Sequence, residues 1–276
     1  MKLKGLRSCI FILFFAQISA QLTSQAAFAA GILDINYIDP NNLAGVIPQN
    51  VANQAIKLFG IYTAHRSYTG ATSIGQSNSL DILVEASLVK LGPGLVDALN
   101  QDGIAGTPPA IPAVPMAKVQ LRKSLGERMD LGFSGLFYRG QEILGGDLKI
   151  VLHDSEEGPA VALRLGYTYA SVPYAYVKNC STISPELVLS QRLYFAEPYI
   201  GIGGRYIQGT LEIPFQGIPP LIPNFTIDKS GSGVTAYAFT GIFFRVLPMA
   251  GLRIGIEGTF DISGYSSIGS VVGIGF

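Results

Sequence analysis

From residue 79 to the last residue, apolar and polar side chains alternate with a period of two, and this pattern limits the folds open to the chain. In the stretch 252–262, for example, aliphatic and aromatic residues oppose Arg253, Glu257 and Asp261. A period of two is that of a β-strand with two unlike faces. Ten such stretches can be counted, at residues 80–90, 116–124, 129–138, 144–153, 160–170, 181–192, 199–208, 234–246, 252–262 and 266–276. The sequence therefore predicts an all-β, antiparallel fold over residues 79–276.

The charged residues of these stretches lie in mid-strand, opposite the aliphatic face, as Glu85, Lys149 and Arg164 illustrate. A soluble sheet would bury its apolar face, whereas a membrane barrel turns that face to lipid and its charged face to the lumen. After residue 30 no apolar run approaches the ~20 residues of a transmembrane helix, but each stretch is near the ~9–11 residues of a membrane-crossing strand. We therefore expect a transmembrane β-barrel of about ten strands, with eight and twelve as alternatives.

The connections between the stretches differ in length. Those at 125–128, 154–159, 193–197 and 247–249 are short, and they alternate with the long ones at 91–115, 171–180 and 209–233. Short turns of such barrels face the periplasm and long loops face outward, so an even strand number leaves both barrel ends in the periplasm. The loops 91–115 and 209–233 are apolar and rich in proline. They either pack on each other over the barrel mouth or offer a surface to a partner.

The N-terminal part of the chain has a different pattern. Residues 1–29 read as a secretory signal peptide, with basic residues at its start, an apolar core at 10–15 and Ala27-Phe28-Ala29 before the expected cleavage site. In residues 30–78, apolar residues recur at spacings of three and four, which predicts a helix broken or started near Pro48. This segment is either a periplasmic extension or a plug inside the lumen.

The C-terminal strand has Ser270, Val272, Ile274 and Phe276 on one face, opposite glycines that leave space for any inserted segment. It resembles the closing strand of bacterial outer-membrane β-barrels, which ends on phenylalanine. That resemblance implies an outer-membrane location, contact with lipid and an assembly signal read by the barrel assembly machinery.

Four further stretches resemble uncharacterised outer-membrane proteins of Gram-negative bacteria: AHRSYTGATSIG at 64–75, LDILVEASLV at 80–89, GPAVALRLGYTY at 158–169 and EPYIGIGG at 197–204. This second resemblance implies a barrel and brings no activity.

The face opposite the aliphatic one carries charges of both signs. The residues expected to face the lumen are Asp81, Glu85, Lys118, Arg122, Asp147, Lys149, Arg164, Arg205, Arg253 and Glu257, together with Asp130, Glu186, Arg192 and Asp261. They form either a charge-compensated network that fills a narrow lumen or the lining of a pore for small solutes. A structural or surface-interaction barrel is the first functional hypothesis and a narrow porin-like channel the second.

Hydrolysis is the third hypothesis. The chain has two histidines, and they limit the groups that could catalyse it. His153-Asp154 and His65-Arg66-Ser67 are the candidate groups, with Asp81 and Glu85 as a carboxylate pair, but general acid–base chemistry needs contacts that spacing alone does not give. Neither histidine has metal-ligand spacing, so no metal or cofactor is expected. Cys180 is the one cysteine beyond the signal peptide, which excludes an intrachain disulfide. With 19 basic and 19 acidic residues, the chain is not basic enough to suggest nucleic-acid binding.

Overall fold

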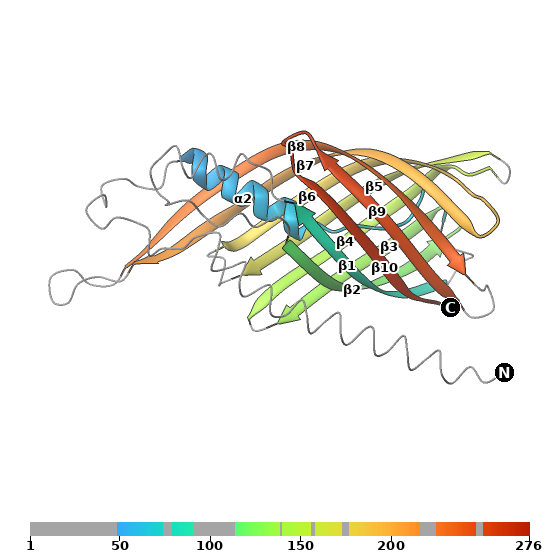
Figure 1. Cartoon of the computed structure of the whole chain (residues 1–276), viewed down its shortest axis with the longest axis horizontal. Helices are drawn as coiled ribbons and strands as arrows, with labels where there is room; N and C mark the ends of the chain where they lie inside the picture. The colour runs from blue at the N-terminus through green and yellow to red at the C-terminus, as the bar shows by residue number, and fades with distance from the viewer. Residues whose placement is uncertain are drawn as a thin grey trace.

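The computed structural model describes residues 49–73, 79–90, 114–138, 140–155, 158–172, 177–215, 225–246 and 251–276. These residues form one α-helix and a closed β-barrel of ten strands (Figure 1). The helix is α2 (Gln49–Thr63), and the strands are β1 (Leu80–Lys90), β2 (Val114–Gly126), β3 (Met129–Tyr138), β4 (Gln141–His153), β5 (Pro159–Val172), β6 (Val177–Gln191), β7 (Ala196–Phe215), β8 (Phe225–Val246), β9 (Leu252–Asp261) and β10 (Ser266–Gly275). The predicted signal peptide, residues 30–48 and residues 91–113 of the first long loop lie outside the described residues.

Every strand pairs antiparallel with its neighbours in sequence, and β1 closes the ring by pairing with β10. In that closing pair Ile82 faces Ile274 and Glu85 faces Val271, so the outward and inward sets match across the seam. Closure leaves no unpaired strand edge, which hydrocarbon would not tolerate. The prediction of a ten-stranded antiparallel barrel is confirmed.

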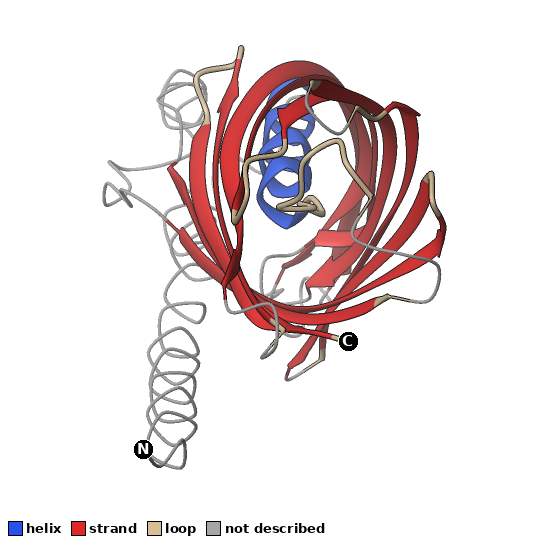
Figure 2. Cartoon of the chain, turned by 90° about the vertical axis from the view of Figure 1, so that its right-hand side faces the viewer, coloured by secondary structure: helices blue, strands red, loops and turns tan. Residues whose placement is uncertain are grey.

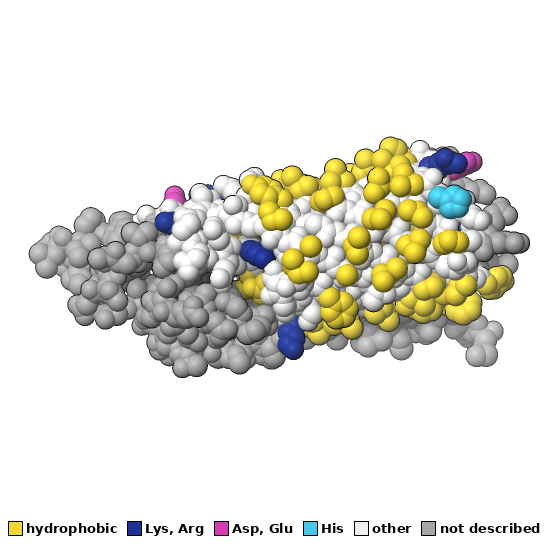
Figure 3. Space-filling view, turned by 90° about the horizontal axis from the view of Figure 1, so that it is seen from above, with side chains coloured by type: hydrophobic (Ala, Val, Ile, Leu, Met, Phe, Trp, Pro, Cys, Tyr) yellow, Lys and Arg dark blue, Asp and Glu magenta, His cyan; other side chains and the backbone are white. Residues whose placement is uncertain are grey.

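The outer surface of the barrel is apolar. Leucine, isoleucine, valine and phenylalanine side chains point outward from the strands, and Figure 3 shows them spread over the wall. Phe133, Leu165 and Ile202 are each more than half exposed, which would be costly for so many residues in water. The face that a soluble sheet would bury is therefore the outer one here.

Two predicted loops are partly strand, because the strands next to them are longer than predicted. The predicted loop 209–233 continues β7 to Phe215 and begins β8 at Phe225, so these strands form a ribbon that projects from one end of the barrel (Figure 1). Residues 216–224 lie outside the described part. The predicted loop 171–180 shrinks in the same way, because Val172 already pairs with Val177. The predicted loop bounds were wrong because the residues at the loop edges form strand by pairing with a neighbouring strand, which satisfies their backbone hydrogen bonds and which a local sequence pattern does not show.

Helix α2 lies inside the barrel. The view down the barrel shows it within the ring of strands (Figure 2), and it packs on β8, β7, β6 and β5. Its apolar residues Ile56, Leu58 and Phe59 are buried. At Gly60 the helix approaches the wall so closely that a Cβ there would lie 2.3 Å from a methyl group of Ile207. The amphipathic pattern that follows Pro48 is therefore satisfied by the lumen wall rather than by another helix.

Candidate functional site

The candidate site is the lumen, which is filled by residues 49–73, called the plug from here on. After α2 the plug runs on from Ala64 to Ser73, and every one of these residues is buried. A backbone without regular secondary structure needs partners for its N–H and C=O groups when it is buried inside a barrel. The wall provides acceptors: the amide of His65 donates to Thr168 Oγ1 (2.8 Å), and the amide of Thr72 donates to Glu197 Oε1 (3.0 Å).

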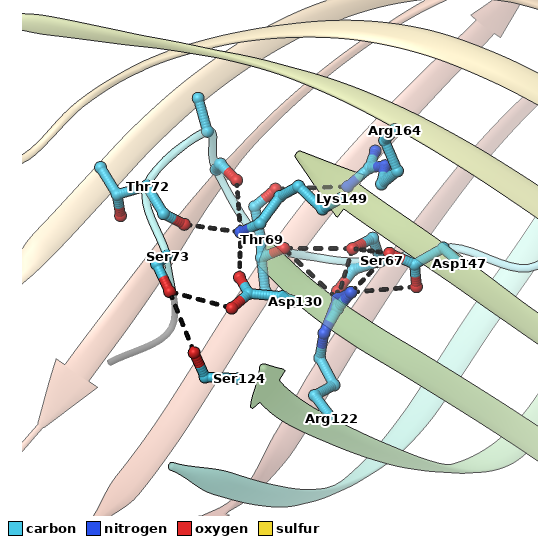
Figure 4. A network of polar contacts seen from close by, with 12 residues as sticks. Ser67, Thr69, Thr72, Ser73, Arg122, Ser124, Asp130, Asp147, Lys149 and Arg164 are labelled. Atoms are coloured by element: carbon cyan, nitrogen blue, oxygen red, sulfur yellow. Dashed lines mark hydrogen bonds and ion pairs between the residues drawn. The ribbon is translucent and has the colours of Figure 1, made fainter. Parts of the chain in front are cut away.

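Cationic wall residues donate to the carbonyl oxygens of the plug. Lys118 Nζ donates to the carbonyls of Thr63 (2.7 Å) and Ala64 (2.9 Å). Arg122 Nη1 donates to the carbonyl of Ser67 (2.7 Å). Further along, Lys149 Nζ donates to the carbonyls of Gly70 (3.2 Å) and Thr72 (2.5 Å) and Arg164 Nη1 to that of Thr69 (3.4 Å) (Figure 4). Four predicted lumen cations thus bind the plug's main chain.

Three of these four cations pair with carboxylates of the wall. Arg122 Nη2 donates to both oxygens of Asp147 (2.9 and 2.7 Å), and Lys149 lies 2.9 Å from Asp130. Arg164 pairs with Glu186. A buried charge is strongly unfavourable without such a partner, so plug and wall form one mutually dependent network.

Of the fourteen charges predicted to face the lumen, eleven are buried, Glu186 and Arg253 are partly exposed, and Arg192 is exposed. Arg253 lies at one end of the barrel, 3.5 Å from Asp81. Glu85 accepts from Gln120 and lies 3.5 Å from Arg66 of the plug, whereas Arg205 stacks on Tyr237 and lies 3.8 Å from Asp261. Glu257 accepts from Tyr199 (3.0 Å).

The prediction that Arg192 faces the lumen was wrong. This residue faces solvent next to Asp154, because β6 ends at Gln191 and Arg192 belongs to the following turn.

The plug explains part of the glycine pattern in β10. A Cβ on Gly269 would lie 2.0 Å from the hydroxyl of Tyr68, so the predicted space beside the closing strand is taken by a plug side chain. Tyr68 itself is fully buried and donates to Glu85 (3.1 Å). Gly273 and Gly275 instead face the wall residues of β1 and Arg253. On the other face of β10, Val272, Ile274 and Phe276 are exposed and Ser270 is partly so.

His65 brings together three residue types of a hydrolytic triad. Its ring nitrogens lie 2.8 Å from Ser134 Oγ and 2.5 Å from Asp147 Oδ1. All three side chains are buried, and Arg122 already binds both oxygens of Asp147. The arrangement holds His65 of the plug against the wall residues Ser134 and Asp147. His153 is exposed on the outer surface, and Asp154 beside it pairs with Arg192.

Sequence reasoning missed Arg66 and Glu197 as lumen groups. Arg66 lies in the plug, and Gln120 donates to its carbonyl (2.8 Å) and to Glu85 (2.8 Å). Glu197 accepts from Thr72 and from Ser190 (2.7 Å). The alternation over residues 116–124 placed Gln120 on the same face as Lys118 and Arg122, and all three side chains are buried.

Among the described residues, no group of three or more histidine, cysteine, aspartate or glutamate side chains could hold a metal ion. Within the same residues, no helix is long and apolar enough to span a membrane.

No protein-family model matches the chain, and no curated protein matches it either. Similar solved structures include the Ail attachment invasion locus protein of Yersinia pestis in complex with a heparin analogue (11% identity, 73% of this chain, 100% of that one, TM-score 0.33). A second is the N-terminal β-barrel domain of Pseudomonas aeruginosa OprF, with 12% identity over 73% of this chain and 100% of that one and a TM-score of 0.34. A third is the Escherichia coli outer-membrane protease OmpT, with 10% identity over 76% of this chain and 99% of that one and a TM-score of 0.34. All three are outer-membrane β-barrel proteins. This chain has the closed ring and the apolar outer surface, called the apolar belt from here on, of a transmembrane β-barrel. Identities and TM-scores this low transfer no role.

Proposed function

We propose that this chain is a bacterial outer-membrane β-barrel whose lumen is closed by its own residues 49–73, and that it has a structural or surface-interaction role. The apolar belt and the terminal Phe276 support the location, together with the expected signal peptide. The observation that carries the closed lumen is the binding of plug carbonyls by Lys118, Arg122 and Lys149.

The plug uses the same charges that a solute pore would need. Selectivity in a pore depends on charged side chains that line a water path. Here Arg122 and Arg164 each bond the plug and a carboxylate of the wall. A plugged barrel with such a network presents its loops and outer surface, rather than its lumen, to partners.

The ribbon of β7 and β8 is the surface that we expect to meet a partner. Its outward residues change from apolar Ile202 and Tyr206 to neutral polar Gln208 and Thr210 along β7. The ribbon therefore continues beyond the apolar belt into water. The loop 91–115 remains a second expected contact surface. At the other end, exposed Val272, Ile274 and Phe276 are the expected assembly signal.

A narrow channel is the second candidate function, and one observation favours it. Among the described residues, both oxygens of Asp81 and the Nε and Nη1 atoms of Arg205 are buried without a hydrogen-bond partner. Polar atoms of this kind favour hydration, so a lumen that the plug leaves would be polar enough to fill with water. Channel activity would then require plug movement.

Planar-bilayer recordings separate the two functions. We expect the refolded mature chain to give no steady conductance, and a variant lacking residues 49–73 to give discrete steps. Steps of equal size from both proteins would contradict the plugged-lumen proposal, because the plug would then leave the water path unobstructed. Fractionation that finds the native protein outside the outer membrane would contradict the location.

A further inference from the structure

The plug has a direction, and its first residues lie at the ribbon end of the barrel. Gln49 Nε2 donates to the carbonyl of Ser230 (2.8 Å), and Asn53 Oδ1 accepts from the amide of Ser232 (3.2 Å). A Cβ on Gly231 would lie 2.9 Å from Asn53 Oδ1. The first turn of α2 is therefore held against the ribbon, and Gln49 itself is exposed.

The last residues of the plug lie at the opposite end, beside the short turns and the C-terminus. Ser73 Oγ donates to Asp130 Oδ1 (2.9 Å), near the turn between β2 and β3. After the plug, the amide of Ser124 donates to the carbonyl of Ser79 (3.0 Å). Leu80 and Phe276 then exchange backbone hydrogen bonds of 3.2 and 2.8 Å. The plug thus starts at the ribbon end of the barrel and ends at the opposite end, where Phe276 lies.

The plug consequently crosses the apolar belt from one side to the other. Along β8, outward Val234 is 70% exposed and apolar, whereas the next outward residues toward the ribbon tip are Ser232 and Ser230. Gln49 contacts this polar part of β8, beyond the belt. Figure 1 shows the same arrangement, with the start of α2 toward the ribbon and the C-terminus at the far end.

We propose that the chain crosses the outer membrane through its own lumen, so that Gln49 lies at the cell surface and Phe276 in the periplasm. The inference rests on the proposed outer-membrane location, in which short turns face the periplasm. A secreted chain reaches this membrane from the periplasm, so whatever precedes Gln49 in the mature protein is carried outward. The barrel thereby displays its own N-terminal segment, next to the ribbon.

Cysteine labelling of intact cells tests this topology. In a Cys180→Ala background, Gln49→Cys is compared with Asp228→Cys on the exposed ribbon and Tyr194→Cys in an exposed turn at the other end. A membrane-impermeant maleimide should label Gln49→Cys and Asp228→Cys equally before and after the cells are permeabilised. Tyr194→Cys should be labelled several-fold more after permeabilisation. An epitope tag inserted between Pro48 and Gln49, detected by antibody on intact cells, provides a second reading that does not depend on thiol access.

The outcomes separate the inference from the proposed function. If Asp228→Cys is labelled on intact cells but Gln49→Cys and the tag are reached only after permeabilisation, the passage through the lumen is wrong while the location stands. If Asp228→Cys is also protected in a protein found in the outer membrane, the assigned orientation is wrong. A protein absent from the outer membrane would refute the proposed location itself.

Discussion

Replacing Arg122 with methionine should open the lumen. Arg122 is 1% exposed, donates twice to Asp147 and also donates to the carbonyl of Ser67 and to Thr69 Oγ1. Removing one partner of a buried ion pair costs about 3–5 kcal/mol, because the other charge is left buried. In this barrel the cost falls on the plugged state, since water in an emptied lumen would solvate Asp147.

At about 1.4 kcal/mol per factor of ten, this cost lowers the equilibrium constant for plug docking by about a hundredfold to several thousandfold. We expect Arg122→Met to show open-channel bursts in planar bilayers and a lower urea midpoint than the native barrel. The matched control is Arg192→Met, because Arg192 is exposed and lies 3.5 Å from Asp154, a pair that contributes only ~0–1 kcal/mol. If Arg122→Met shows no more channel openings than Arg192→Met and has the same urea midpoint, the reasoning is refuted.

Three other changes test separate parts of the structure. Gly60→Leu should also release the plug, because its Cβ would lie 2.3 Å from Ile207. The control is Gly204→Leu on β7, whose Cβ would have its nearest neighbour at 3.8 Å and which should conduct no more than the native barrel. Equal conductance of the two variants would argue against close packing of the helix on the wall. Deleting Phe276 should reduce the amount of heat-modifiable barrel in the outer membrane, because the exposed end of the closing strand is lost, and a normal amount would count against the assembly signal. His65→Ala should leave peptide and phospholipid hydrolysis by the purified barrel at the background of the native protein, and a native activity that His65→Ala abolishes would restore the hydrolase hypothesis.

The barrel could be predicted from the sequence because each strand repeats one local rule. Ile82, Val84 and Leu88 share a face whatever the rest of the chain does, so the outward and inward sets follow from the period of two. The strand ends were less predictable. The residues from Gly209 to Phe215 form a strand only because residues 225–231 pair with them, and that pairing has no local signature.

The contacts of the plug could not be predicted in the same way. Arg122 is 55 residues from Ser67 in the chain, and alternation shows only that it points inward. The sequence left open whether such charges compensate one another or line a pore, and it offered no signal that they would bind backbone carbonyls. Gly269 is the exception, because its missing side chain predicted space for an inserted segment and Tyr68 fills that space.

A disulfide between the plug and the wall tests most directly whether α2 occupies the lumen. A Cβ on Gly233 would lie 3.3 Å from the Cβ of Lys57, close to the ~3.5–4.5 Å of natural disulfides. In a Cys180→Ala background, Lys57→Cys with Gly233→Cys should form a bridge in the membrane-embedded protein, seen as a reductant-sensitive shift on gels of the unfolded chain. Lys57→Cys with Val119→Cys, which faces outward, should form none. If both pairs stay reduced under mild oxidation, or if both form, the helix does not lie where the structure places it.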